Sequence, residues 1–308
     1  MENKNFIYRR NCPICLLDNL EIKFCKSLDD PRIHLEEIFK ENISPNDTMG
    51  AGFNVVLCPR CDFFFVTDVP TDEFYEKLTS FRSKIGAPLL RRQMSQGIHY
   101  FANYGLEAEK ISVLLNLKPY DINVLEFGSG NGHWLLMAKA YGYNVCGIEI
   151  REDRIDFSKK NGLLIFHSIE ELGGQKFDFV RSDLVFEHLV DPLFHLHALV
   201  KCLKPNGIIQ IGVPEGDKIR KVLPTLNEKP NKLITPFGHI NCFTHKSLVA
   251  LAKKAGLTLV STNKLRMLYF KAMLKHRDTK YIGELIKAGR KQNRSCTLYF
   301  YQTGDKKK

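Results

Sequence analysis

Four cysteines form two pairs with the same internal spacing, Cys12-Pro13-Ile14-Cys15 and Cys58-Pro59-Arg60-Cys61. Four thiolates from two such turns make a closed tetrahedral site of the kind that holds structural zinc. A redox pair would instead be a single Cys-x-x-Cys beside a strand–helix–strand unit, and both pairs lie before any such unit. The sequence therefore predicts a structural Zn²⁺ on Cys12, Cys15, Cys58 and Cys61.

A second feature with chemical potential is a glycine-rich turn at residues 124–134, which read Val-Leu-Glu-Phe-Gly-Ser-Gly-Asn-Gly-His-Trp. Glycines let the backbone turn sharply and approach a ligand, and the N-terminus of the following helix offers N–H groups. A purely structural turn is the simpler interpretation of one such loop. Glu149, at the end of the next predicted strand, adds a carboxylate that could hold two ribose hydroxyls.

The elements that must position these groups follow from changes of pattern along the chain. Residues 1–70 carry the cysteine pairs, residues 71–118 have helical spacing, and short strands alternate with helices from residue 121 onward. Five strands with helical crossovers predict a parallel sheet covered on both faces. We predict these strands at 122–127, 144–150, 163–166, 177–180 and 207–213, with later elements at 244–255 (helix), 257–260 (strand), 281–291 (basic helix) and 297–301 (strand).

The motifs together resemble a known enzyme family. Residues 126–132, Glu-Phe-Gly-Ser-Gly-Asn-Gly, resemble the first motif of the class I S-adenosylmethionine-dependent methyltransferases, and Glu149 matches their acidic ribose contact. Further matches, in chain order, are residues 177–180 with 184–192, residues 203–207 with 213–215, and residues 237–244 with 247–248 and 255–257. Five ordered motifs cover roughly residues 110–304.

This resemblance implies a fold and a cofactor. The expected fold is α/β, a Rossmann-like doubly wound and mostly parallel seven-stranded sheet, with a small N-terminal zinc-knuckle domain. The expected domains are residues 1–70 (zinc knuckles), 71–118 (helical connector or lid) and 119–308 (methyltransferase). The positions implied to hold S-adenosylmethionine are Glu126, Gly128, Ser129, Gly130, Gly132, Glu149, Ser168, Ile169 and Asp183.

One position departs from the family pattern. Many members place an Asp near position 167 to contact adenine, whereas this chain has Phe166-His167-Ser168-Ile169. The side chain of Ser168 or the backbone at Ile169 is expected to serve instead.

Two histidines are candidates for the base that removes the acceptor's proton. His188 and His239 lie on loops that follow predicted strands, where open α/β sheets bind ligands, and histidine is the usual base near neutral pH. Either ring could instead be bonded to its own loop. Glu187 could orient His188, contact the donor, or satisfy N–H groups at a helix start. His195 and His197 are expected to be surface or packing residues, and Trp134 a core residue.

Charge and composition limit the class of protein. The 308 residues carry 45 Lys and Arg against 34 Asp and Glu, a formal net charge of +11. Residues 271–308 hold much of that excess, either as a solvated surface or as a site for an anionic partner. No run approaches the roughly 18 apolar residues of a membrane span, and the N-terminus lacks the pattern of a secretory signal. These features favour a cytoplasmic protein with reduced thiols, in which Cys25, Cys146, Cys202, Cys242 and Cys296 are buried as small hydrophobes.

Two functions from different classes remain open. In the first, the chain methylates a small and anionic, phosphate-bearing acceptor: a sugar hydroxyl or carbon in a nucleotide- or lipid-linked glycan. Zinc knuckles before such a domain resemble bacterial enzymes of sugar and surface-polysaccharide pathways. In the second, the knuckles and the basic tail bind RNA, as part of a methyltransferase or of a non-catalytic module. The knuckles carry few basic residues and no base-methylation motif is present, which favours the small acceptor. The oligomeric state is left open.

Overall fold

The computed structural model describes residues 4–30, 33, 43–79, 98–226, 231–261, 263, 265, 267 and 295–302. Two compact units alternate along the chain. The first comprises Met1–Leu89, Phe186–Leu193 and Val213–Lys254, and the second comprises Leu90–Val185, Phe194–Gly212 and Ala255–Lys308. The predicted domain boundaries at 70 and 118 stay a prediction, but the cysteine-bearing residues share their unit with two later segments of the chain.

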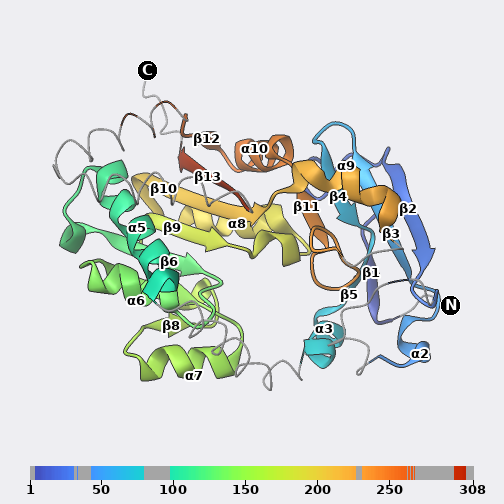
Figure 1. The fold of residues 1–308 in the computed structure, drawn as a ribbon, viewed down its shortest axis with the longest axis horizontal. Helices are drawn as coiled ribbons and strands as arrows, with labels where there is room; N and C mark the ends of the chain where they lie inside the picture. Colours follow the sequence, from blue (N-terminus) through green and yellow to red (C-terminus); the bar gives the residue numbers. More distant parts are fainter. Residues whose placement is uncertain are drawn as a thin grey trace. The chain divides into compact units, whose positions relative to one another are not determined.

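The second unit is built on a seven-stranded sheet with the order β12-β13-β10-β9-β6-β7-β8 (Figure 1). The pairs β6–β7, β6–β9, β7–β8 and β9–β10 are parallel, and β12–β13 is antiparallel. The predicted α/β fold with a mostly parallel seven-stranded sheet is therefore confirmed. The strands are β6 (Asn123–Phe127), β7 (Asn144–Ile148), β8 (Ile165–Phe166), β9 (Phe177–Asp183), β10 (Leu203–Pro214), β12 (Leu257–Leu259) and β13 (Ser295–Gln302).

Central strands of this sheet are buried on both faces. Val124 and Leu125, which are neighbours in β6, are both fully buried, and so are Phe179 and Val180 in β9. A strand covered on both faces needs consecutive apolar residues rather than alternating ones. The helices in this part of the chain are α5 (Ile98–Leu115), α6 (His133–Ala140), α7 (Glu152–Lys160) and α8 (Pro192–Lys201), with short 3-10 turns η2 (Pro119–Asp121) and η3 (Glu170–Leu172).

The first unit contains a four-stranded sheet with the order β11-β4-β3-β2, in which all neighbours are antiparallel. Its strands are β2 (Glu21–Ser27), β3 (Gly52–Cys58), β4 (Phe63–Val66) and β11 (Asn241–Phe243), and β1 (Phe6–Tyr8) pairs separately with β5 (Asp68–Pro70). No element was predicted from the sequence between residues 213 and 244, and β11 was therefore missed. Its register sets Asn241 opposite Phe65 and Phe243 opposite Phe63.

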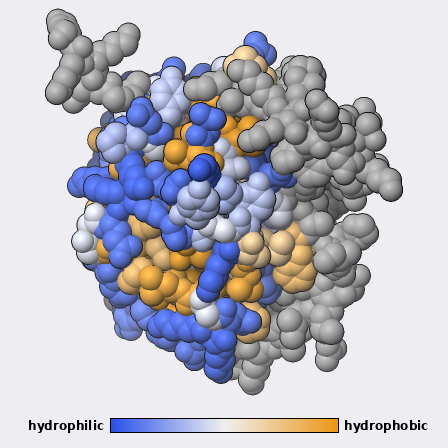
Figure 2. Space-filling view, turned by 90° about the vertical axis from the view of Figure 1, so that its left-hand side faces the viewer, coloured by the Kyte–Doolittle hydropathy of each residue, from blue (hydrophilic) through white to orange (hydrophobic). Residues whose placement is uncertain are grey.

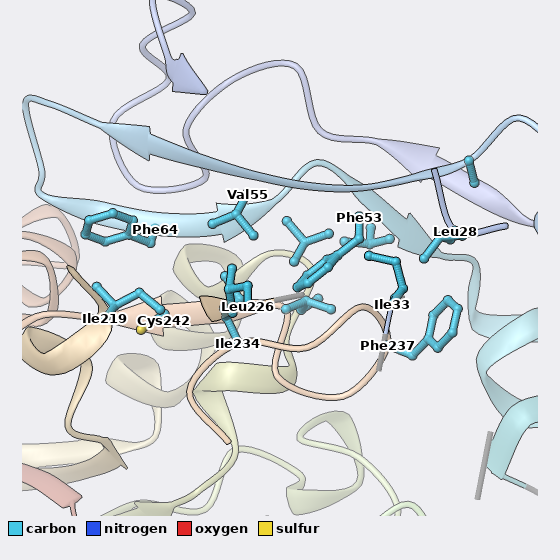
Figure 3. Close-up of a cluster of buried hydrophobic side chains, with 14 of the residues drawn as sticks. Leu28, Ile33, Phe53, Val55, Phe64, Ile219, Leu226, Ile234, Phe237 and Cys242 are labelled. Carbon is cyan, nitrogen blue, oxygen red and sulfur yellow. The ribbon is translucent and has the colours of Figure 1, made fainter. Parts of the chain in front are cut away.

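Strands from the N-terminal residues and a later segment share one apolar core (Figure 3). Phe53, Val55 and Phe64 extend from β3 and β4. Facing them are Ile219, Leu226, Ile234, Phe237 and Cys242. The remaining elements of this unit are α2 (Pro45–Thr48), α3 (Asp72–Thr79), η4 (Phe186–His188), η5 (Gly216–Lys218), α9 (Ile219–Val222), η6 (Leu223–Thr225) and α10 (His245–Lys254). Residues 213–254 therefore fold with the cysteine-bearing strands and complete their core.

The burial of Trp134 and of the five cysteines outside the two pairs was also predicted. Trp134 is buried as predicted, and so are Cys146, Cys202 and Cys242. Cys25 is exposed on β2 and Cys296 is only half-buried, so the prediction that both are buried was wrong. Phe24, the apolar neighbour of Cys25, packs against the core from the other face of β2, since side chains alternate along a strand.

The surface drawn in Figure 2 carries mainly hydrophilic residues, with smaller areas of hydrophobic ones. Within the described ranges, no helix combines the length and the apolar character that crossing a membrane requires. The predicted basic helix at 281–291 lies outside the described residues, as does most of the basic tail.

Candidate functional site

The glycine-rich turn follows β6 directly, and its three glycines have different roles. Gly128, Gly130 and Gly132 have φ of 76°, 57° and 69°, a region that favours glycine. A Cβ at Gly128 would lie 2.3 Å from Val185, and one at Gly132 would lie 2.3 Å from Leu163. At Gly130 a Cβ would meet nothing within 4 Å. The outer glycines therefore allow close packing, while Gly130 turns the backbone toward open space in which a ligand can lie.

Glu149 follows β7, and its buried carboxylate reaches the same turn. Its Oε2 accepts a hydrogen bond from the N–H of Gly130 at 2.8 Å, and its Oε1 accepts from the N–H groups of Ile150 (3.0 Å) and Arg151 (3.1 Å). The structure thus brings together the loop and the acidic residue that the sequence analysis paired. A carboxylate fixed in this way is suited to accept hydrogen bonds from the two hydroxyls of a ribose.

A buried charge cluster lies beneath the turn, and its cation was missed in the sequence. Arg181 on β9 contacts Glu126 at 2.5 Å, Glu107 at 3.1 Å and Asp183 at 3.1 Å. Burial alone would lower the pKa of Arg181, but the three carboxylates outweigh it and raise that pKa. Glu126 and Asp183, both predicted to contact the cofactor, thus contact Arg181. Only the tertiary fold reveals this arginine, because the sequence around it is that of an ordinary buried strand.

The cluster keeps an excess of negative charge. Burial raises the pKa of Glu126 to about 8, against the opposing effect of Arg181. Glu107 and Asp183 by themselves outnumber the one guanidinium that they contact. S-adenosylmethionine carries a sulfonium and an ammonium group, so a net negative environment fits this cofactor.

Ser129, Ser168 and Ile169 are the other predicted cofactor positions. Ser129 is buried, and among the described residues its Oγ has no hydrogen-bond partner, as expected of a group that contacts a ligand. Ser168 and Ile169 lie between β8 and η3. The Ser168 hydroxyl lowers the pKa of Glu170 by hydrogen bonding to it. An adenine contact at Ser168 or Ile169 stays a prediction.

The two candidate histidines lie side by side in the first unit. The ring centroids of His188 and His239 are 4.9 Å apart, at an interplanar angle of 76°. Nδ1 of His188 lies 2.8 Å from the carbonyl oxygen of Gly238, and Nδ1 of His239 lies 2.6 Å from that of Lys232. A carbonyl only accepts hydrogen bonds, so each Nδ1 carries the proton and Nε2 carries the lone pair of the neutral ring.

Glu187 completes this histidine cluster. Its side chain is fully buried, and its carboxylate and the two imidazoles offer polar atoms that all lie within 4.8 Å of one another. A carboxylate at this range stabilises a neighbouring imidazolium. Of the roles open to Glu187 in the sequence, the structure favours the one that acts on His188. By contrast, His195 is half-buried near Phe127 and His197 is exposed, in agreement with packing and surface roles.

The four paired cysteines converge in the first unit, with their sulfur atoms all within 4.8 Å of one another. The Sγ atoms of Cys15 and Cys58 are 3.6 Å apart, close to the separation of about 3.8 Å in a tetrahedron with Zn–S bonds of roughly 2.3 Å. The two turns share a backbone form. The N–H of Leu16 donates to the Cys12 carbonyl at 2.9 Å, and the N–H of Asp62 donates to that of Cys58 at 2.8 Å.

The titration of these thiols shows why the cluster fits a cation. Hydrogen bonding from Cys61 lowers the pKa of Cys12 to about 5, whereas burial raises that of Cys58 to about 12. One thiolate therefore forms readily, whereas burial makes a thiolate at Cys58 costly. Four thiolates can coexist here only with a positive charge among them, and Zn²⁺ with four sulfur ligands supplies it.

A sequence profile described as "Methyltransferase domain" matches residues 90–262, more than half of the chain. The chain belongs to this methyltransferase-domain family. The match and the seven-stranded sheet confirm the resemblance to the S-adenosylmethionine-dependent methyltransferases.

Similar proteins agree with this assignment. The ubiquinone biosynthesis O-methyltransferase of Bartonella tribocorum is 30% identical over 105 residues, and that of Rickettsia akari is 32% identical over 108 residues. These alignments cover 31% and 32% of this chain and 42% and 43% of those proteins, so the chain spans less than half the length of either. The plantazolicin methyltransferase BamL, solved in complex with a triazolic desmethylPZN analog and SAH, has a similar fold. Its TM-score is 0.52 at 15% identity, over 75% of this chain and 94% of that one.

The open side of Gly130 generates a first prediction. In this methyltransferase domain, Gly130→Val should weaken S-adenosylmethionine binding at least about tenfold, because the new side chain occupies the ligand's space. Gly256→Val is the matched control, since Gly256 also has a positive φ (76°) and nothing within 4 Å of its Cβ position. Isothermal titration calorimetry measures both. Equal affinity in the two variants would contradict the placement of the ligand at Gly130.

A second prediction concerns the carboxylate. Glu149→Gln should weaken S-adenosylmethionine binding by about 10- to 150-fold, the value of a charge-assisted hydrogen bond of roughly 1.5–3 kcal/mol. Glu152→Gln, three residues along and exposed, should bind as the native chain does. Adenosine alone should show the same loss as the full cofactor if Glu149 holds the ribose. An unchanged adenosine affinity would mean that Glu149 accepts hydrogen bonds from the backbone of the turn but does not bind the ribose.

Proposed function

We propose that this chain transfers a methyl group from S-adenosylmethionine to a small acceptor, a sugar hydroxyl or carbon in a nucleotide- or lipid-linked glycan. The observation that carries the proposal is the pair of imidazoles anchored through Nδ1 beside a buried carboxylate. Such a pair is an arrangement for removing a proton, which hydroxyl and carbon acceptors require. The names of the two curated relatives include O-methyltransferase, which supports an oxygen acceptor.

In this proposal the chain's residues align the reactants and move one proton. When bound, S-adenosylmethionine supplies an electrophilic methyl group on a sulfonium. Gly130 and Glu149 hold the donor, and Nε2 of a histidine takes the proton from the acceptor as the acceptor attacks. Glu187 stabilises the imidazolium that forms. Because the reaction is an in-line displacement, alignment supplies much of the rate enhancement.

His239 is the proposed base, with His188 as its neighbour. His239 is held by its Nδ1 bond to Lys232, and its backbone N–H donates to Thr235 Oγ1 at 2.9 Å. Two anchors on the same loop fix the direction of Nε2. His188 is bonded through Nδ1 to Gly238, the residue before His239, and so supports that loop.

The proposed acceptor class and the proposed partners are inferred from the amino-acid sequence. The resemblance of the cysteine knuckles to those of sugar-pathway enzymes supports a glycan precursor, and an excess of basic residues suits a phosphate-bearing one. RNA remains the alternative. A cytoplasmic location also stays a proposal.

We also propose that Cys12, Cys15, Cys58 and Cys61 hold one structural Zn²⁺. Four sulfur ligands leave no open coordination position, so the ion would stabilise the fold rather than take part in the reaction. The converging sulfur atoms and the two matching turns support this proposal.

The acceptor is tested by transfer of a labelled methyl group. We expect label from S-adenosylmethionine to enter a pool of nucleotide sugars and not to enter RNA. Label in RNA alone, with a salt-dependent gel shift of the same RNA, would overturn the glycan proposal in favour of the alternative.

The base is tested by variants and by pH. His239→Gln should reduce turnover by about 10²–10⁴, the usual size of a base's contribution, without changing donor affinity. A base must be neutral, so the native rate should fall toward acid pH, and this acid limb should be absent in the variant. His197→Gln, an exposed histidine on α8, is the control. Full turnover in His239→Gln, His188→Gln and the double variant would remove histidine from the mechanism.

The zinc proposal is tested by metal analysis. Cys58→Ser should reduce zinc from one ion per chain to near none and lower the melting temperature, because metal binding is coupled to folding. Cys25→Ser, an exposed cysteine on β2, should change neither. Native protein purified without chelators that contains no zinc would count against the site.

A further inference from the structure

Arg9 is a buried cation three residues before the first cysteine pair. All five of its guanidinium N–H groups find acceptors. Nε donates to the carbonyl oxygen of Val66 (2.9 Å), and Nη2 donates to those of Val66 (2.5 Å) and Ile240 (2.9 Å). Nη1 donates to Asn241 Oδ1 (2.8 Å) and to the carbonyl oxygen of Val190 (3.3 Å). A planar guanidinium group whose N–H donors are all hydrogen-bonded fixes the positions of the backbone segments around it.

Those acceptors flank both histidines of the proposed site. Ile240 directly follows His239, and its carbonyl oxygen accepts from Arg9 and also from the N–H of Val66 at 2.9 Å. Val190 is two residues beyond His188. One guanidinium thus ties the two histidine-bearing segments to β4, the strand that follows the second cysteine pair.

Asn241 extends this connection. Its Oδ1 accepts from Arg9, so its Nδ2 faces the opposite way and donates to the carbonyl oxygens of Phe186 (3.0 Å) and Leu189 (2.6 Å). Glu187 and His188 lie between those two residues in the chain. The amide therefore holds both ends of the short turn that carries them.

Charge and position link Arg9 to the cysteine cluster. Arg9 lies three residues before Cys12, and its own N–H donates to the Thr67 carbonyl at 2.8 Å. Burial lowers the pKa of Arg9 to about 9, with Cys12 and Asp191 opposing the change, so the group is charged at neutral pH. The guanidinium carbon of Arg9 lies over the aromatic ring of Phe65, 5.0 Å from the ring centroid.

We propose that Arg9, acting through Asn241, is a positioning residue that connects the cysteine-bearing strands to the paired histidines and fixes the direction of both imidazoles. This inference rests on the proposed function for its catalytic meaning. The N-terminal segment would then take part in the reaction indirectly, because its Arg9 holds the backbone beside both histidines in place.

The test reads the imidazoles directly and needs no acceptor. Long-range ¹H–¹⁵N NMR of the full chain identifies which ring nitrogen carries the proton, with His188→Gln and His239→Gln assigning the two signals. In the native protein both rings should show the Nδ1–H form at neutral to basic pH. Arg9→Lys keeps the charge but lacks the fork, and should replace both signatures with averaged ones. Arg10→Lys, an exposed neighbour, should leave them unchanged.

A second variant separates positioning from folding. Asn241→Asp keeps an acceptor for Arg9 but loses both N–H donors, so the His188 signature should change while zinc content stays close to native. The melting temperature should fall, because the two buried carbonyl oxygens lose their donors. If Arg9→Lys does not fold, this variant decides. Native signatures in a folded Arg9→Lys or in Asn241→Asp would overturn the inference. Failure of the proposed function would appear elsewhere, as full turnover in the histidine variants of the native Arg9 chain.

Discussion

The pairing of β11 with β4 is the constraint on which the first unit depends. Asn241 faces Phe65 in this register, which brings a late segment of the chain into the sheet that also carries the second cysteine pair. Three ladder positions alone contribute little, but they align a shared apolar core and the hydrogen bonds of Arg9 and Asn241. Separating β11 from β4 would expose that core and remove the anchors of both histidines. The folding of the cysteine-bearing segment and the geometry of the proposed base therefore depend on the same strand pairing.

Local signals explain why much of the second unit was predictable. The strands at 123–127 and 144–148 follow from consecutive apolar residues, and the glycine turn follows from a conformation that favours glycine at Gly128, Gly130 and Gly132. The contact between Glu149 and the turn was expected because carboxyl ends of neighbouring parallel strands meet at one edge. Each of these inferences needs only residues that are close in sequence or repeated at a regular period.

The parts that were missed depend on partners far away in the chain. β11 has three residues, too few for a period to show, and its partner strand lies near residue 65. No sequence motif marks Arg9 or Arg181, and only the fold supplies their acceptors. Cys25 was predicted to be buried and is exposed, because apolar sequence neighbours do not determine which face of a strand a side chain occupies. That His188 and His239 lie side by side was likewise not foreseen, because they were treated as alternatives.

The two buried arginines show how differently a fold can compensate a charge. Arg181 is surrounded by carboxylates, which outweigh the cost of its burial and raise its pKa. Arg9 meets mostly carbonyl and amide oxygens, whose dipoles compensate less than full charges do, and burial lowers its pKa to about 9. Carbonyl acceptors belong to the backbone, so Arg9 is bound to the path of the chain rather than to exchangeable side chains. A cation that neutralises a site would use carboxylates, as Arg181 does, whereas one that fixes several segments relative to one another would use carbonyls. The acceptors of Arg9 therefore indicate that its role is to hold backbone in place.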